Sequence, residues 1–354
     1  MKRKIVLFCV FVFGVLSNCL MAKDSLKLLT WKGYAPKALI DKFEKQTGYK
    51  VEVTYSNNEE MIAKLRATRG AGFDIIQPSQ DRIFSVQKKY KLYKAIDYSK
   101  IKTKQIIPSM LEAVKKNTNV DGKSYAIPFC YGTSGLIVNK KYASDVDDYT
   151  DLLNKKYAGK ISYRLKRPVL IGVAFAKGEN PFSKYSNRDE YKKLMEDVAK
   201  DLIDAKQYVK TYWSNGDSLL QLLRSEEVVV AMGWDNGAWK LHKENPNIDF
   251  VVPKSGALGW IDTFAIASKA KNIKGAYAWI NFMLEPENAA YFTNNEGYAT
   301  ASNNASKYLN KDIKGDFERS FTKKDIDNIN WYPPVPAKLE QIEGRLLDEI
   351  KASN

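Results

Sequence analysis

The spacing of apolar and polar positions in the first quarter of the chain predicts short strands that alternate with helices. Apolar residues at Leu39, Ile40 and Phe43 recur on one helical face, Pro36 is typical of a helix start and Gly48 of a helix end. The expected order is strand 25–30, helix 37–47, strand 50–55, helix 59–68 and strand 73–77. Such alternation predicts an α/β domain whose sheet is dominated by parallel pairs.

The second half of the chain continues the alternation without repeating the sequence. Its clearest strand is the fully apolar run 228–232, and its last helix, 337–350, has an amphipathic pattern. The other elements expected here are strand 159–163, helices 191–205 and 218–223, strand 261–267 and helix 273–284. No repeat of solenoid period and no glycine-rich phosphate loop occurs in the sequence. The chain length suits two domains rather than one.

Aromatic and polar residues follow the strands at the places where α/β sheets bind ligands. Such ligands lie beyond the carboxyl ends of the strands, which is where Trp31, Tyr34 and Ser79 fall. Trp260 and Asp262 are two positions apart in an expected strand, so their side chains point to one face. An aromatic ring beside a carboxylate can hold an organic cation. Taken alone, the pair favours the other interpretation, a core Trp and an Asp that starts a turn.

The beginning of the chain has the pattern of a secretory signal peptide. Positions 2–4 are basic, and Ile5–Leu16 is an unbroken apolar run of twelve residues, too short to span a bilayer comfortably. We expect a signal peptide over 1–22. The alternatives are a retained anchor helix and a lipoprotein at Cys19, which Asn18 opposes because lipid attachment normally needs a small residue there.

Cysteine, histidine and charge narrow the function classes. Beyond the expected signal peptide, Cys130 is the only cysteine and His242 the only histidine in the sequence. This argues against a disulfide framework, a zinc site of the usual ligands and a Ser-His triad. The net charge is +15, but the lysines are mixed with acids and no basic arm occurs, so we expect no nucleic-acid partner. We expect Cys130 to be a small buried residue and His242 to be exposed.

Eight short segments between Trp31 and Tyr298 carry a family pattern. They are Trp31-Lys-Gly-Tyr34, Lys42-Phe-Glu-Lys-Gln-Thr-Gly48, Phe73-Asp-Ile-Ile-Gln-Pro-Ser79, Tyr125-Ala-Ile-Pro128 with Gly132 and Val138-Asn139, Gly233-Trp-Asp-Asn-Gly237, Trp260-Ile-Asp262, Ile280-Asn-Phe-Met-Leu-Glu-Pro286 and Glu296-Gly-Tyr298. In this order they resemble the periplasmic polyamine-binding proteins of ABC importers, the spermidine/putrescine receptor family.

The resemblance implies a two-lobed periplasmic binding protein fold of type II-like α/β class, in which a hinge closes the lobes around a ligand. By that likeness, lobe 1 would hold 23–129 plus 261–306. Lobe 2 would hold 130–260 plus 307–354. It further implies a periplasmic receptor with no catalytic residue, no metal and no cofactor, which acts as a monomer and delivers a small amine-containing ligand to a membrane permease.

The resemblance also implies where the ligand binds. The family boxes the hydrocarbon part of a polyamine with aromatic rings and holds its ammonium ends with carboxylates. The positions that match or lie beside this pattern are Trp31, Tyr34, Ser79, Lys166, Trp234, Asp235, Trp260, Asp262, Tyr298 and Tyr332. Among them Asp262 would hold an ammonium group, and Trp260 would supply an aromatic face.

Several positions depart from the family pattern. Gly33 stands where the family has an acid, Lys166 and Val169 fall on two further acid positions, and Tyr332 replaces a glutamine. Two like charges about 4 Å apart cost about 4 kcal/mol at an effective dielectric of about 20, so a lysine facing a ligand ammonium would weaken binding severely. A solvated basic turn formed by Arg164, Lys166 and Arg167, with the placement slightly shifted, is the other interpretation.

Four hypotheses remain at this point. The first is a receptor for putrescine or spermidine, and the second is the same receptor for a zwitterionic amine, such as an ω-amino acid or aminoalkylphosphonate, whose acidic end meets Lys166. A ferric-iron receptor is opposed by the lack of two adjacent tyrosines. An exported enzyme would need Asp235 and Asp262 as an acid and base pair.

Overall fold

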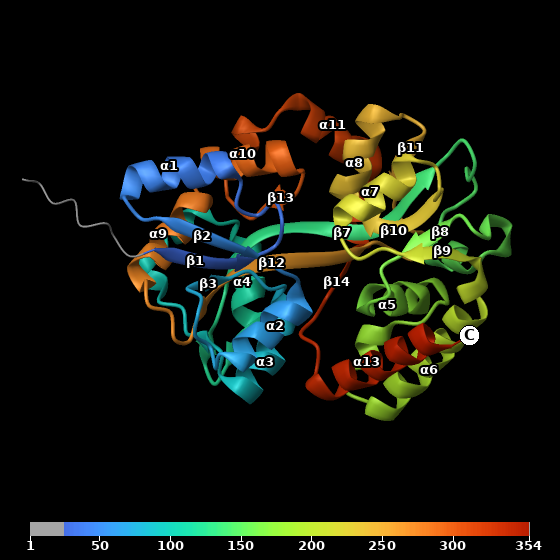
Figure 1. Cartoon of the computed structure of the whole chain (residues 1–354), viewed down its shortest axis with the longest axis horizontal. Coiled ribbons are helices and arrows are strands. Elements are labelled where there is room, and N and C mark those ends of the chain that lie inside the picture. Colours follow the sequence, from blue (N-terminus) through green and yellow to red (C-terminus); the bar gives the residue numbers. More distant parts are fainter. Residues whose placement is uncertain (1–24, 354) are drawn as a thin grey trace, which may run out of the picture.

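The computed structural model describes residues 25–353, which form two α/β lobes side by side (Figure 1). The signal peptide expected over 1–22 lies outside these residues. No helix within 25–353 has both the length and the apolar character needed to cross a membrane. The two-lobed α/β architecture predicted from the sequence is confirmed.

One continuous sheet runs through both lobes in the order β2-β1-β3-β12-β7-β10-β8-β9. Its central strands, β7 (Ile127–Asn139) and β12 (Leu258–Ala267), are antiparallel to each other. The first half of β7 pairs with β12 and the second half with β10, while the far end of β12 pairs with β3. Both strands therefore cross from one lobe to the other (Figure 1). The predicted boundaries at 129 and 260 fall inside them, and the residues at which the lobes divide stay a prediction.

The sheet mixes parallel and antiparallel pairs, which corrects the expectation of a parallel-dominated sheet. In lobe 1, β1 is parallel to β2 and β3, and in lobe 2, β8 is parallel to β9 and β10. The two crossing strands are antiparallel to each other and to β3 and β10, whereas β12 pairs in parallel with the short strand β14. The local alternation of strands and helices indicates parallel units but carries no signal for a strand that arrives from the other lobe.

Lobe 1 surrounds its part of the sheet with helices on both faces (Figure 1). Helix α1 ends at Gly48 in the left-handed conformation, as the sequence predicted. The elements are β1 (Leu26–Thr30), α1 (Lys37–Thr47), β2 (Val51–Tyr55), α2 (Asn58–Ala67), β3 (Ile75–Ile76), α3 (Ile83–Tyr90), β4 (Tyr93–Lys94), α4 (Pro108–Asn117), β5 (Asn119–Val120), β6 (Lys123–Ser124), α9 (Ile273–Met283), α10 (Pro286–Glu296) and β13 (Ala299–Thr300).

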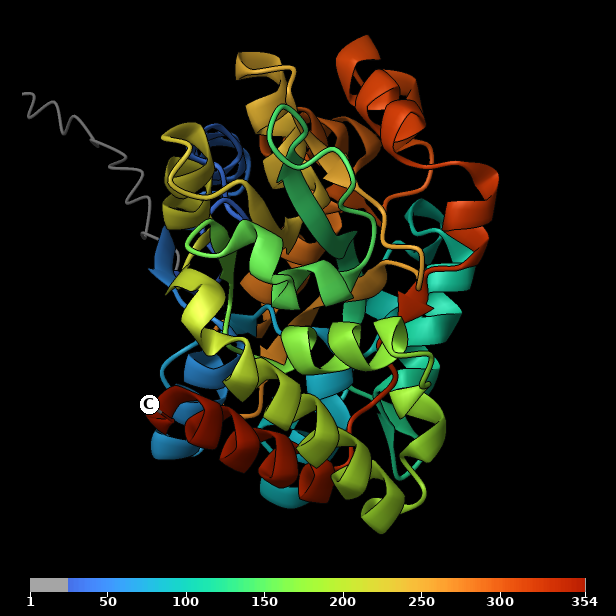
Figure 2. The ribbon, with the colours of Figure 1, turned by 90° about the vertical axis from the view of Figure 1, so that its right-hand side faces the viewer.

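Lobe 2 is built from the middle of the chain and from its end. The C-terminal helix α13 packs along α6 on the outer face of this lobe (Figure 2). The elements are β8 (Ile161–Tyr163), α5 (Arg167–Ala176), α6 (Arg188–Asp204), β9 (Val209–Tyr212), α7 (Gly216–Arg224), β10 (Val230–Trp234), α8 (Asp235–Glu244), β11 (Ile248–Val251), α11 (Lys311–Ser320), α12 (Lys323–Asp327), β14 (Asn330–Trp331) and α13 (Ala337–Ala352).

Apolar cores lie on the faces of the sheet in each lobe. In lobe 1, Phe43 of α1 packs edge-on against Trp279 of α9, with ring centroids 5.0 Å apart. In lobe 2, the fully buried Tyr149, Tyr163 and Leu202 belong to a core that joins the sheet to α5, α6 and α13. Cys130 is fully buried in β7, as expected for a small core residue. The packed cores hold the strand ends, and hence the residues after them, in fixed positions.

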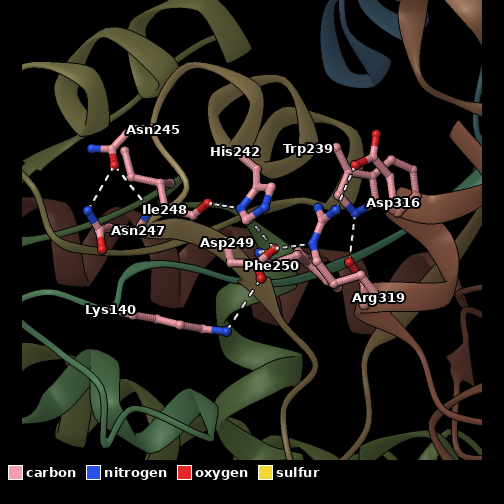
Figure 3. Close-up of polar contacts among 11 residues, drawn as sticks. Lys140, Trp239, His242, Asn245, Asn247, Ile248, Asp249, Phe250, Asp316 and Arg319 are labelled. Atoms are coloured by element: carbon pink, nitrogen blue, oxygen red, sulfur yellow. Dashed lines mark hydrogen bonds and ion pairs between the residues drawn. The ribbon is translucent and has the colours of Figure 1, made fainter. Parts of the chain in front are cut away.

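His242, which we expected to be exposed, is mostly buried, with 23% of its side chain accessible. Its Nδ1 lies 2.9 Å from the carbonyl oxygen of Ile248 and 3.8 Å from the carboxylate of Asp249 (Figure 3). Lys140 and Arg319 each approach the same carboxylate at 3.4 Å. The residue is therefore part of a charged cluster that ties α11 to β11, and its Lys- and Glu-rich sequence neighbours conceal that inward position.

Candidate functional site

A cleft of about 930 Å³ lies between the lobes and is lined by both. Its walls are formed largely by residues that follow the outer strands, which is the edge of the sheet that the sequence indicated. Nine of the ten predicted ligand-binding residues line it: Trp31, Tyr34, Ser79, Lys166, Trp234, Trp260, Asp262, Tyr298 and Tyr332. The structure thus brings together side chains that lie as far apart in sequence as Trp31 and Tyr332.

Asp262 is buried, with 4% of the residue exposed, where β12 passes Ser79. One carboxylate oxygen accepts a hydrogen bond from the Tyr34 hydroxyl and the other from the Ser79 hydroxyl, each at 2.5 Å. Within residues 25–353 no basic side chain pairs with it. Burial raises the pKa of Asp262 to about 7, and the two hydrogen bonds offset that effect only in part.

The two hydroxyl groups are fixed as donors to Asp262. Burial, together with the neighbouring carboxylate, raises the pKa of Tyr34 well above its ordinary value, so the phenol keeps its proton. Asn58 donates a hydrogen bond of 2.9 Å to the Ser79 oxygen, which leaves the Ser79 proton for Asp262. A carboxylate has about four lone-pair directions, so Asp262 retains acceptor capacity toward the cleft.

Aromatic rings surround Asp262 in a connected series. The ring centroids of Trp260 and Tyr298 are 5.7 Å apart, those of Tyr298 and Tyr34 5.3 Å, and those of Tyr34 and Trp31 6.4 Å. The indole of Trp31 is fixed by a hydrogen bond of 2.9 Å to the carbonyl oxygen of Gln77. The indole N–H of Trp260 is buried and has no partner in the described part of the chain. The series is suited to an alkyl chain that ends in an ammonium group.

A second wall of the cleft is basic. Glu59 of α2 lies 3.8 Å from Arg82 of lobe 1 and 3.9 Å from Arg164 of lobe 2. Burial opposes ionisation of Glu59, but the charges of Arg82, Arg164 and Lys166 outweigh it and lower the pKa of Glu59. Lys166 has no carboxylate within ion-pair distance among the described residues. Arg82 also lies 3.3 Å from Glu340, so Arg164 and Lys166 are the cations of this wall with the least carboxylate compensation.

Arg167 is buried rather than exposed in a solvated turn, because it starts α5 and points between the lobes. Its guanidinium lies 2.6 Å from Asp81 of lobe 1 and 3.1 Å from Glu343 of lobe 2. It also lies over the ring of Tyr332, 4.9 Å from the centroid. No local pattern in the sequence indicates this ion pair across the lobes, since its members are far apart in the chain.

Two positions singled out in the sequence do not line the cleft. Asp235 begins α8 and is buried, where its carboxylate accepts hydrogen bonds from the backbone N–H and the hydroxyl of Thr133, at 2.8 and 2.9 Å. Burial raises the pKa of Asp235 to about 6. Val169 is fully buried in the core of lobe 2. The carboxylate of Asp235 thus fixes the start of α8 against β7, and it does not stand with Asp262 in the cleft wall.

Comparison with known proteins points to one class. Residues 38–319 match the family model described as bacterial extracellular solute-binding protein. The chain is 30% identical to the spermidine/putrescine-binding periplasmic protein 1 of Haemophilus influenzae, over 94% of this chain and 90% of that protein. It is 29% identical to the spermidine/putrescine-binding periplasmic protein of Escherichia coli, over 89% and 88% of the two chains. The structure resembles that of a putative spermidine/putrescine ABC transporter from Listeria monocytogenes, with a TM-score of 0.81, 28% identity and coverage of 93% and 99%.

Proposed function

Since the chain belongs to the bacterial extracellular solute-binding protein family, we propose that it is the periplasmic receptor of an ABC importer and that it binds putrescine or spermidine between its lobes. The periplasm is the compartment in which its relatives act, as their names state. A membrane permease is the partner that this role requires. The prediction that the receptor is monomeric and binds no nucleic acid is part of the proposal.

The observation that carries the proposal is the environment of Asp262. A buried carboxylate without a positive partner is unfavourable, and its raised pKa reflects that cost. A ligand ammonium in the cleft would supply the missing charge and use the remaining acceptor directions of the carboxylate. The rings of Trp260, Tyr298 and Tyr34 would cover the adjacent methylene groups.

Titration calorimetry of the purified mature protein with putrescine and with spermidine tests the proposal. We expect binding of one amine per protein, and Asp262→Asn should weaken it by about ten- to a hundredfold, since a hydrogen bond to a charged group contributes about 1.5–3 kcal/mol. Asp147→Asn is the control, because Asp147 pairs with Lys254 at the surface and neither residue lines the cleft. Absence of heat with both amines would refute the polyamine proposal.

A zwitterionic amine is the second candidate, favoured by the basic wall formed by Arg82, Arg164 and Lys166. Its ammonium group would bind Asp262 and its acidic group would approach Lys166. In that case Lys166→Ala should weaken binding of 4-aminobutyrate or 2-aminoethylphosphonate by about tenfold, as expected for one charge-assisted hydrogen bond. Lys37→Ala is a matched control, because Lys37 also lines the cleft but is already paired with Asp41. Unchanged affinity for both acidic ligands in Lys166→Ala would exclude this candidate.

Binding without turnover is the remaining part of the proposal. The buried Asp235 is engaged by Thr133, so Asp262 has no second carboxylate from that position to act with it. Ligand recovered after prolonged incubation with the protein should be chemically unchanged by mass spectrometry. Appearance of a product in proportion to protein concentration would instead favour the enzyme hypothesis.

A further inference from the structure

Carboxylates in the cleft differ in how well other side chains satisfy them. Six line it: Glu59, Glu60, Asp81, Asp217, Asp262 and Glu296. Four have cations or donors of their own: Asp81 has Arg167, Asp217 has Lys32, Glu59 has Arg82 and Arg164, and Glu60 has Lys64 and the Ser56 hydroxyl. The two that remain are Asp262, which has only hydroxyl donors, and Glu296, to which the described residues supply a single cation at 3.7 Å and no hydrogen-bond donor.

Glu296 is the less satisfied of these two. Only 25% of its side chain is exposed, yet its carboxylate makes no hydrogen bond within residues 25–353, and its nearest cation is Lys240 at 3.7 Å. Lys240 is 42% exposed and belongs to α8 of the other lobe, so water competes for its charge and this single ion pair contributes little. A partly buried carboxylate normally finds donors. Glu296 is therefore available to a donor that enters the cleft.

Gly33 makes the position of this carboxylate possible. Its φ of +89° is one that residues with side chains rarely adopt, and an ideal Cβ on Gly33 would lie 2.7 Å from Oε2 of Glu296. The carboxylate thus occupies the space that a side chain at position 33 would fill. It lies beside the aromatic series, because Gly33 precedes Tyr34 and Glu296 comes two residues before Tyr298.

The backbone of Glu296 is also fixed. It ends α10, and Gly297 follows in the left-handed conformation. The side-chain amide of Asn236, at the start of α8 in lobe 2, donates a hydrogen bond of 2.9 Å to the carbonyl oxygen of Glu296. The carboxylate is consequently placed at a point where both lobes meet the ligand cleft.

We propose that Glu296 is the second ammonium-binding carboxylate of this receptor and that it selects diamines over monoamines. One ammonium group binds Asp262, the methylene groups cross the aromatic series, and the other ammonium group replaces Lys240 as the partner of Glu296. This inference rests on the proposed polyamine-binding function and assigns its second charge to a named residue.

Affinities for putrescine and for 1-aminobutane, which has the same carbon chain but one ammonium group, separate the two subsites. Glu296→Gln should weaken putrescine binding by about tenfold and change 1-aminobutane binding by less than about twofold. Asp262→Asn should weaken both. Glu60→Gln is the control, because it removes one cleft charge whose carboxylate already accepts a hydrogen bond from the Ser56 hydroxyl.

Three results would separate failure of the Glu296 subsite from failure of the proposed receptor function. If the wild type binds putrescine and Glu296→Gln leaves that affinity unchanged, or weakens both amines equally, the subsite is wrong and the receptor role stands. If the wild type binds 4-aminobutyrate more tightly than putrescine, the far end of the ligand meets Lys166 and the diamine subsite is again overturned. If the wild type binds neither putrescine nor 1-aminobutane, the proposed function fails and the subsite fails with it.

A second variant makes the test independent of Glu296 itself. Gly33→Ala places a Cβ where the carboxylate lies, so it should reproduce the selective loss of putrescine binding. Backbone strain at position 33 is checked by the thermal midpoint of the ligand-free variant. A folded Gly33→Ala protein with wild-type affinity for putrescine would contradict the proposed position of the second ammonium group.

Discussion

Affinity for putrescine should depend on pH through Asp262, because its pKa of about 7 in the ligand-free protein lies near neutral pH. The ligand ammonium requires the ionised carboxylate, and alkylammonium groups, like that of lysine with a pKa near 10.4, keep their charge throughout this range. Binding therefore selects the ionised fraction of the receptor, and the apparent dissociation constant scales inversely with that fraction.

The magnitude follows from the same pKa. At pH 8.5 nearly all Asp262 carboxylates would be ionised, whereas at pH 5.5 about 3% would be, so the affinity should fall by about thirtyfold, or about 2 kcal/mol, between these values. Near pH 7 the binding reaction should release about half a proton per ligand.

Calorimetry at pH 5.5, 7.0 and 8.5, repeated in two buffers with different enthalpies of ionisation, measures both the affinity and the proton release. Asp262→Asn should remove the pH dependence together with most of the affinity. A wild-type affinity that is constant over this range would refute the reasoning from the environment of Asp262. Either the carboxylate would be exposed or paired with a cation in the free protein, or it would not contact the ligand ammonium.

Two further outcomes concern buried charges and a third concerns the aromatic series. The pKa of Asp262 is higher in the folded than in the unfolded state, so its contribution to stability is fully present below its ordinary pKa and is lost as the pH rises through about 7. Ligand-free Asp262→Asn should therefore unfold at a higher temperature than the wild type at pH 8. An unchanged or lower thermal midpoint would contradict the assigned burial cost. Arg167→Met leaves Asp81 and Glu343 without their shared cation and should lower the free energy of unfolding by about 3–5 kcal/mol in urea titration; a loss below about 1 kcal/mol would show that the cluster is not buried in solution. Trp260→Ala should weaken putrescine binding by about 1–2 kcal/mol, because the ring would cover methylene groups whose burial contributes about 0.8 kcal/mol each, and an unchanged affinity would remove this ring from the site.

Local pattern was sufficient for much of the fold. Helix α1 has its predicted bounds because Pro36 and Gly48 mark its ends and one face is apolar, and β1 delivers Trp31 to the cleft because the strand ends where its apolar run ends. The period of two along β12 correctly placed Trp260 and Asp262 together in the cleft wall.

Long-range relations were not predictable in this way. Strand β7 crosses between the lobes, and Arg167 pairs with Asp81, which is distant in the sequence; neither has a local periodicity that would reveal it. Glu296 was seen only as part of a short motif before Tyr298. Its place beside Gly33 depends on the docking of α10 against the loop after β1. The glycine at position 33 showed that the family's acid is missing there, but it did not indicate which residue fills the space.

A crystal structure of the protein with putrescine tests the central claim most directly. We predict an ammonium nitrogen within about 2.7–2.9 Å of the Asp262 carboxylate, the typical length of a charge-assisted hydrogen bond, with the methylene groups against Trp260 and Tyr298. Putrescine bound elsewhere, or an Asp262 that contacts only Tyr34 and Ser79 in the complex, would contradict the account.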